Sequence, residues 1–307
     1  MPHSIPYSNT SCANVAEMVV FCSMTIKTAY QQLVLALFEI YDDREAANIA
    51  NWVIEAVTGF NKINRIMHPE INLSSSQQNL LENYTAELLQ HKPVQYVLKQ
   101  AWFCGLQFYV NESVLIPRPE TEELVAWILE DTKGLNGNII DIGTGSGCIA
   151  IALKIQNPAL NVTAIDISEK ALEVAEQNAE QIRADVQFKK INILNKEEWT
   201  ALPEFDWIVS NPPYITLHEQ NEMPINVVKY EPHQALFVPD NEPLVFYTTI
   251  AVFAKKHLKK NGCIFFEVHE HFANATEQAC INLGFKTVLR KDMQGKNRML
   301  KAIKCFE

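Results

Sequence analysis

The fold class of this 307-residue chain is decided by residues 139–147, which read IIDIGTGSG. The mostly apolar run 139–142 predicts a buried strand, and the three glycines that follow predict a tight turn from which a helix begins. Because glycine has no Cβ, the backbone of such a turn can approach a bound ligand closely. A strand, a glycine turn and a helix in this order are typical of doubly wound α/β proteins.

Helices and strands alternate around this turn from residue 116 to the C-terminus. Alternation of this kind predicts a mostly parallel, Rossmann-like sheet of seven strands with helices on both faces. Ser168 is the expected N-cap of the helix after the second strand. The expected helices cover residues 121–131, 147–156, 169–182, 244–258 and 273–283, and the expected strands cover 138–142, 162–167, 186–190, 207–210, 262–268 and a closing pair.

The chain before residue 116 has a different pattern. Apolar residues recur at helical spacing over residues 24–92, which predicts a small helical bundle. Residues 93–115 are expected to form a β-hairpin linker from the β-prone stretches 95–98 and 106–110. Residues 1–23 are expected to be a disordered leader or to lie outside the native protein, with Met24 as its start.

The composition disfavours several classes of protein. Asp and Glu outnumber Lys and Arg by 36 to 26, a net charge of −10, so stable binding of nucleic acid through its phosphates is not expected. The seven cysteines show no CxxC spacing, which disfavours a zinc site and suits a reducing compartment. No apolar run is long enough to span a bilayer. We expect a monomeric, cytoplasmic protein without a metal ion.

An acid follows the glycine turn at the end of the next expected strand. Asp166 lies 23 residues after Gly143, where a carboxylate can accept hydrogen bonds from both hydroxyls of a ribose. The turn has the spacing GxGxG rather than GxGxxG, which favours S-adenosylmethionine over a dinucleotide. An ordinary strand-to-helix turn and a nicotinamide cofactor are the alternatives. Asp141 could contact the amino group of the methyl donor indirectly, or it could bond the N–H groups of its own turn.

A second motif, Asn211-Pro212-Pro213-Tyr214, directly follows the expected strand 207–210. Ligands of open α/β sheets bind outside the carboxyl ends of the strands, so this motif lies where chemistry would occur. The side-chain oxygen of Asn211 and the carbonyl of Pro212 can each accept one N–H of an NH₂ group, and Tyr214 can stack on a flat substrate. Holding both hydrogens would aim the lone pair of a planar nitrogen at an electrophilic methyl group. The alternative is a rigid proline turn capped by the asparagine.

The combination of motifs resembles one family. Residues 116–122 read IPRPETE, residues 141–147 read DIGTGSG, and residues 211–215 read NPPYI. Together they look like the HemK/PrmC family of peptide chain release factor N5-glutamine methyltransferases, and the resemblance runs from Met24 to the C-terminus. The Asn-Pro-Pro-Tyr motif alone is shared with DNA adenine methyltransferases, whereas the segment 116–122 is much more particular.

The resemblance implies that residues 116–307 form a methyltransferase catalytic domain and that residues 24–92 recognise the substrate. The implied substrate is the glutamine of the Gly-Gly-Gln motif in class 1 release factors. Where this chain has Asn192 and Ile193, many relatives have Asp and an aromatic residue. The residues implied to act in catalysis or to bind glutamine are Asn211, Pro212, Pro213 and Tyr214, and those implied to bind the methyl donor are Gly143, Thr144, Gly145, Ser146, Gly147, Asp166, Ile193 and Asn211.

Two other functions compete with this interpretation. An N6-adenine nucleic-acid methyltransferase would need base flipping and a basic path for DNA, which the net charge of −10 disfavours. A non-catalytic adaptor that binds release factors through the helical bundle would have no use for an intact Asn-Pro-Pro-Tyr motif. Glu231 and Pro232 are expected to be structural rather than catalytic. Four histidines show no spacing typical of ligands, and most of them are expected to be surface or satisfied polar residues: His218, His233, His269 and His271.

Overall fold

The computed structural model describes residues 24–305. The chain divides between Asn83 and Tyr84 into two compact units, and the expected domain boundary at residue 92 stays a prediction. The expected leader, residues 1–23, lies outside the described residues. Within the described part of the chain, no helix is both long and apolar enough to cross a membrane.

The first unit is helical. It contains α1 (Ile26–Leu37), α2 (Asp43–Thr58), α3 (Lys62–Met67) and the first part of α4 (Ser75–Leu88). The side chains of Thr25, Asp42 and Asn61 each accept a backbone N–H of the first helical turn, which explains where α1, α2 and α3 begin. The helical region predicted ahead of the sheet is confirmed. Five of its apolar residues that recur at helical spacing are buried: Ala29, Leu33, Leu37, Ile49 and Val53.

Residues 95–98, which were expected to form a strand, lie instead in a short helix, α5 (Val94–Leu98), so this prediction was wrong. Proline suits the start of a helix because it lacks an N–H. The carbonyl of Pro93 accepts the N–H groups of both Tyr96 and Val97. These two neighbours are both buried, whereas consecutive residues of a strand would point to opposite faces.

A short hairpin does follow α5. It consists of β1 (Ala101–Phe103) and β2 (Leu106–Phe108), which pair antiparallel. The turn residues Cys104 and Gly105 both have positive φ, 50° and 74°, as expected of a two-residue hairpin turn that matches the twist of the strands. The hairpin is therefore shorter than the stretch predicted for it.

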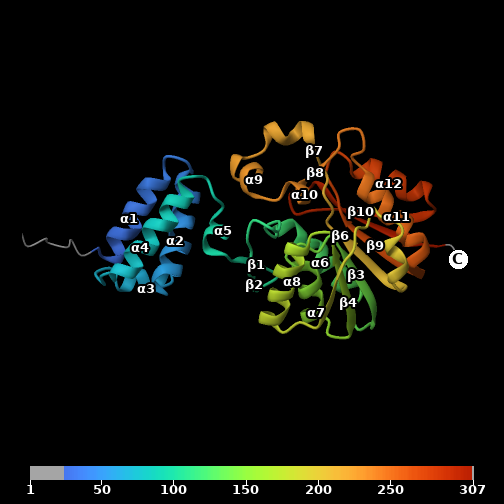
Figure 1. The fold of residues 1–307 in the computed structure, drawn as a ribbon, viewed down its shortest axis with the longest axis horizontal. Helices are drawn as coiled ribbons and strands as arrows, with labels where there is room; N and C mark the ends of the chain where they lie inside the picture. Colours follow the sequence, from blue (N-terminus) through green and yellow to red (C-terminus); the bar gives the residue numbers. More distant parts are fainter. Residues whose placement is uncertain (1–23, 306–307) are drawn as a thin grey trace, which may run out of the picture. The chain divides into compact units, whose positions relative to one another are not determined.

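The second unit is built on a twisted sheet flanked by helices (Figure 1). The sheet has seven strands in the order β10-β11-β9-β6-β3-β4-β5. Strands β9, β6, β3, β4 and β5 are parallel, and β11 and β10 extend the sheet antiparallel at one edge. The order of the strands reverses at β3, which is the switch point of a doubly wound sheet. This arrangement confirms the predicted fold class. The strands are β3 (Gly137–Ile142), β4 (Leu160–Asp166), β5 (Val186–Lys190), β6 (Phe205–Ser210), β9 (Leu258–Glu267), β10 (Phe285–Lys291) and β11 (Asn297–Lys304).

Helices cover both faces of this sheet (Figure 1). On one face, Ile139 and Val209 pack with apolar residues of α6, α7 and α8. On the other face, their neighbours Ile140 and Ile208 pack with apolar residues of α11 and α12. Continuous apolar strands such as β3 are therefore explained by burial on two sides. The helices are α6 (Pro119–Asp131), α7 (Cys148–Gln156), α8 (Glu169–Ile182), α11 (Val245–His257) and α12 (Ala273–Asn282).

After β6 the chain leaves the central sheet, and it rejoins the helices that cover the sheet at α11. Between them, β7 and β8 pair in parallel, so the segment closes on itself. A further 3-10 helix, η1 (Glu198–Ala201), follows β5. Elements this short show no periodicity, and none of them was predicted. The elements between β6 and α11 are β7 (Ile215–Thr216), η2 (Leu217–Glu222), α9 (Ile225–Tyr230), α10 (His233–Leu236) and β8 (Phe237–Val238).

Candidate active site

A cavity of about 470 Å³ lies at the carboxyl ends of β3, β4 and β6. This volume is within the range of 300–1,000 Å³ that is usual for small-molecule sites. The position beside the switch point is the one where open α/β sheets bind ligands. Both predicted motifs contribute to its wall, together with the acid after the second strand. The predicted residues that line it are Gly143, Gly145, Asp166, Ile193, Asn211, Pro212 and Pro213.

The glycine turn requires its glycines for two different reasons. Gly143 and Gly145 have φ values of 76° and 55°, and a Cβ on either would have no protein atom within 4 Å. The open space beside them is the cavity that they line, so the turn can admit a ligand close to the backbone. Gly147 has φ 81°, but a Cβ there would meet Ile151 and Ala175 at 3.0 and 3.1 Å. Gly147 is thus needed for packing of α7.

Thr144, Ser146 and Gly147 do not line the cavity. The Thr144 hydroxyl donates to Asp141 Oδ2 at 2.6 Å. The backbone carbonyl of Ser146 accepts from Asn178 Nδ2 at 2.9 Å. Their expected contacts with the methyl donor therefore stay predictions.

Asp141 is fully buried beneath the turn. Its Oδ1 atom has no hydrogen-bond partner among the described residues. Burial raises the pKa of Asp141 to about 7, and the nearby charge of Asp166 acts in the same direction. Asp141 does not line the cavity, so its expected indirect contact with the amino group of the methyl donor stays a prediction.

Asp166 ends β4 and lines the cavity. Its Oδ1 accepts the N–H of Ser168 at 2.9 Å, and its Oδ2 accepts the N–H of Gly145 at 3.0 Å. Burial raises the pKa of Asp166, while these backbone N–H groups oppose that effect. Each carboxylate oxygen can accept a second hydrogen bond, so the side chain is held in place and can still receive two ribose hydroxyls.

The loop after β5 supplies the third side of the cavity through Asn192 and Ile193. The Asn192 backbone N–H donates to Glu198 Oε2 at 2.7 Å. The indole N–H of the buried Trp199 donates to the Ile193 carbonyl at 2.9 Å. Ile193 thereby presents apolar surface to the cavity from a fixed backbone, which would suit the flat face of a base.

The Asn-Pro-Pro-Tyr segment begins where β6 ends. Asn211 Nδ2 donates to Thr121 Oγ1 at 3.2 Å, so Oδ1 is the side-chain atom left to accept an N–H. The Tyr214 hydroxyl donates to Glu267 Oε1 at 3.1 Å, and burial raises the pKa of this tyrosine. Tyr214 does not line the cavity, so its expected stacking on a substrate stays a prediction.

Sequence reasoning missed part of the site. Thr121 and Glu267 contact the predicted motif from α6 and from the end of β9. Gln234 and Phe237, from the segment between β6 and α11, line the cavity. The nearby Glu231, expected to be structural, is buried and accepts from Arg118 at 2.5 Å.

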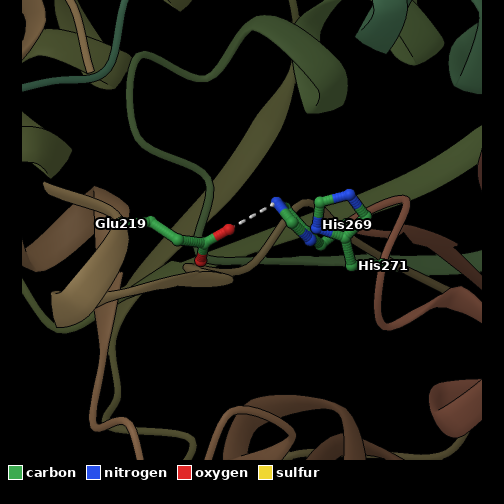
Figure 2. Close-up of side chains that lie close together, drawn as sticks. All are labelled: Glu219, His269 and His271. Carbon is green, nitrogen blue, oxygen red and sulfur yellow. Dashed lines mark ion pairs between the residues drawn. The ribbon is translucent and has the colours of Figure 1, made fainter. Parts of the chain in front are cut away.

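Glu219, His269 and His271 come together beside the motif, although their spacing in the sequence suggests no relation (Figure 2). One possible ligand atom from each lies within 4.8 Å of the others. Glu219 Oε2 already accepts the N–H and the hydroxyl of Thr216, and Oε1 lies 3.4 Å from His269 Nε2. Burial lowers the pKa of His269, whose ring packs on that of Tyr214 at 5.6 Å. The cluster joins η2 to the chain after β9.

A doubly wound sheet with this glycine turn, the acid at the end of β4 and the Asn-Pro-Pro-Tyr segment defines an S-adenosylmethionine-dependent methyltransferase. The family model "Methyltransferase small domain" matches residues 121–236, and "PrmC N-terminal domain" matches residues 28–98. The chain belongs to the family of release factor glutamine methyltransferases. S-adenosylmethionine is accordingly its methyl donor.

Two relatives illustrate the likeness. The release factor glutamine methyltransferase of Flavobacterium psychrophilum is 42% identical over 283 residues, which cover 91% of this chain and 99% of that protein. The protein of the same name from Bacteroides thetaiotaomicron is 38% identical over 268 residues, which cover 87% of this chain and 96% of that protein. Among solved structures, the hMettl16 catalytic domain matches with a TM-score of 0.53 at 16% sequence identity. The match covers 76% of this chain and 83% of the hMettl16 chain, and it concerns the fold alone.

Proposed function

We propose that this enzyme transfers a methyl group from S-adenosylmethionine to the side-chain amide nitrogen of the glutamine in the Gly-Gly-Gln motif of class 1 peptide chain release factors. The names of relatives that match nearly the whole chain support this substrate. One structural observation carries the chemistry. Because Asn211 Nδ2 is held by Thr121, its Oδ1 is left to accept an N–H at the cavity wall, next to Pro212.

A glutamine amide is a poor nucleophile because its lone pair is delocalised into the carbonyl. When bound, S-adenosylmethionine supplies a methyl group on a positively charged sulfur. Asn211 Oδ1 and the Pro212 carbonyl would each accept one N–H of the amide, which fixes the direction in which the nitrogen lone pair points. Both oxygens would also stabilise the positive charge that develops on this nitrogen. As the bond from nitrogen to the methyl group forms, the bond from sulfur to the methyl group breaks and the sulfur keeps its electron pair. The methylated nitrogen then loses one proton to water, so no side chain has to remove a proton before the transfer.

The rest of the site suits the methyl donor. Gly143 and Gly145 would allow its amino-acid part to approach the backbone, Asp166 would accept the ribose hydroxyls, and Ile193 would contact the base. We further propose that the enzyme acts as a cytoplasmic monomer without stable binding of nucleic acid. The net charge of −10 supports the last point, because phosphate contacts need basic side chains.

The test compares three acceptors of the methyl group. The purified enzyme is incubated with methyl-labelled S-adenosylmethionine and a class 1 release factor, the same factor with the glutamine of Gly-Gly-Gln replaced by alanine, or duplex DNA. We expect label only on the unaltered factor, with mass spectrometry placing one methyl group on that glutamine. Label on DNA and none on the release factor would refute the proposal.

A further inference from the structure

A short path of hydrogen bonds connects the side chain of Asn211 to a buried carboxylate. Asn211 Nδ2 donates to Thr121 Oγ1 at 3.2 Å, and Thr121 Oγ1 donates to Glu267 Oε2 at 2.6 Å. The other oxygen of Glu267 accepts the Tyr214 hydroxyl at 3.1 Å. Thr121 is 2% exposed and Glu267 is 1% exposed. Both ends of the Asn-Pro-Pro-Tyr segment are therefore tied to one carboxylate.

The direction of these bonds is set by chemistry. A carboxylate only accepts hydrogen bonds, so it takes the single hydroxyl hydrogen of Thr121. Thr121 Oγ1 is then left with lone pairs only, and these favour the NH₂ group of Asn211 over its carbonyl oxygen. The carboxylate thus decides which of the two similar atoms of the Asn211 amide faces Thr121 and which faces the cavity.

Without an acceptor at Glu267, the Thr121 hydroxyl could donate to Asn211 Oδ1 instead. The amide would then flip and present its NH₂ group to the cavity. Two NH₂ groups, one from Asn211 and one from the substrate, cannot hydrogen-bond productively to each other because neither supplies an acceptor. The flipped state would fold normally and would fail at the chemical step.

We propose that Glu267 is a positioning residue for methyl transfer, which acts through Thr121 to keep Asn211 Oδ1 directed at the substrate amide and through Tyr214 to hold the far end of the segment. This inference rests on the proposed function of Asn211 as an acceptor for the substrate N–H. It assigns a role to the first helical turn of α6, where Thr121 lies, and to the end of β9.

Packing alone does not account for a carboxylate at this position. Burial raises the pKa of Glu267, and the bonds from Thr121 and Tyr214 and the charge of Arg298 oppose that effect. A buried carboxylate is costly compared with an apolar side chain of similar volume. Glu267 is paired through two oriented hydroxyl groups that both lead to the Asn-Pro-Pro-Tyr segment, which is the arrangement that orientation of Asn211 requires.

The test begins with Glu267→Gln. Glutamine has nearly the same shape, but its amide has one accepting oxygen and one donating NH₂ group, so it cannot accept from both Thr121 and Tyr214. We expect kcat for release factor methylation to fall by roughly 10²-fold, the usual cost of a misplaced reacting group. The KM values for S-adenosylmethionine and for the release factor should stay close to those of the wild type.

Two substitutions at Thr121 separate orientation from packing. Thr121→Val removes the hydroxyl and should lower kcat by a similar factor, whereas Thr121→Ser keeps the hydroxyl and should restore most of the rate. Thr287→Val is the matched control, because Thr287 Oγ1 also donates to a glutamate, Glu277 Oε1, at 3.0 Å, away from the cavity lining. This control should leave kcat unchanged.

The outcomes are distinct. The positioning role would be overturned if Glu267→Gln and Thr121→Val both kept the wild-type kcat, whether or not their KM values rose. The proposed function would not be affected by that result. Equal losses in Thr121→Val and Thr121→Ser would overturn the positioning role too. If Glu267→Gln fails to fold, the comparison of Thr121→Val with Thr121→Ser still tests the positioning role. Absence of methylation by the wild-type enzyme in the same assay would instead refute the proposed function.

Discussion

Asn211 and Asp141 are two polar side chains at the same edge of the sheet, and they differ in which of their polar atoms has a hydrogen-bond partner. The NH₂ group of Asn211 is paired with Thr121, and its oxygen is left for a substrate. Asp141 is paired through one oxygen to Thr144, and its other oxygen is buried without a partner among the described residues. Single substitutions at these positions therefore test different properties, the rate of methyl transfer at Asn211 and the dependence of stability on pH at Asp141.

Asn211→Ala removes the acceptor proposed for the substrate N–H. We expect kcat to fall by about 10²–10³-fold, as when one oriented hydrogen-bonding group is lost from an active site. The thermal unfolding temperature should change little. The affinity for S-adenosylmethionine, measured separately by calorimetric titration, shows whether Asn211 also contacts the methyl donor. An unchanged kcat would contradict the assignment, and Asn282→Ala on the exposed side of α12 is the control.

Asp141→Asn should change how stability depends on pH. Burial raises the pKa of Asp141 to about 7 from an ordinary value of 3.8. Between these values the folded protein keeps a proton that the unfolded chain has lost, so wild-type stability falls as pH rises, by at most roughly 1.4 kcal/mol per pH unit. Asparagine does not titrate. The stability of the variant relative to wild type should therefore increase from about pH 4 to about pH 7 and then level off.

Denaturant unfolding at several pH values, without S-adenosylmethionine, measures this difference. Asp185→Asn, at an exposed position after α8, is the matched control for the Asp-to-Asn change. A difference for Asp141→Asn that does not change with pH would show that Asp141 does not keep its proton in the folded protein.

Among single residues, the sequence predicted those that belong to short contiguous motifs. The glycine turn and Asn211-Pro212-Pro213-Tyr214 are such motifs, and their residue types indicate the chemistry they can support. Glu267 was missed, and no contact was predicted for Thr121, which lies in the quoted segment 116–122. The reason is that the contact of Thr121 with Asn211 spans 90 residues and its contact with Glu267 spans 146. Only the packing of α6 against β6 and β9 brings these three side chains together.

Two elements, one helix and one strand, were predicted with the bounds that the structure has. The helix Glu169–Ile182 and the strand Val186–Lys190 have the predicted bounds, and Ser168 caps the former as predicted. The error at 95–98 arose because Tyr96 and Val97 favour strands by type, while the preceding proline and burial of both residues select a helical turn.

Trp199 is the side chain by which η1 supports the methyl donor site. Trp199→Phe would leave the Ile193 carbonyl without its partner, and an unpaired buried group costs about 1–3 kcal/mol. We expect a loss of stability in this range and weaker binding of S-adenosylmethionine. Chemical denaturation and calorimetric titration measure the two effects.

Trp102→Phe is the control for this substitution, because Trp102 is 66% exposed on the β1–β2 hairpin. Its stability should stay within about 0.5 kcal/mol of the wild type. Equal effects of the two substitutions would argue against a special role of the indole N–H at Trp199.

At the scale of the whole molecule, the site belongs to one of the two units. Every residue that lines the cavity lies between Ser113 and Ile250, within the unit that begins at Tyr84. A ligand that binds only the folded form of a unit stabilises that unit. The proposed helical domain for substrate recognition should therefore not respond to the methyl donor alone.

Differential scanning calorimetry tests this division. S-adenosylmethionine at about 100 times its Kd should stabilise the unit of residues 84–307 by roughly 2.7 kcal/mol and raise its melting temperature. The transition of residues 24–83 should stay where it is. Asp166→Ala should reduce the shift at the same ligand concentration. A single transition that moves as a whole would contradict independent unfolding of the two units.

The reversal of strand order at β3 has a consequence for how such enzymes can diversify. Gly143, Asp166 and Ile193, which are proposed to hold the methyl donor, lie at the carboxyl ends of β3, β4 and β5, whereas Pro212, which is proposed to receive the methyl acceptor, follows β6. The long segment from 211 to 244 lies between β6 and α11, outside the parallel strands of the sheet. Changes in this segment can therefore alter the choice of acceptor while the residues that end β3, β4 and β5 stay the same.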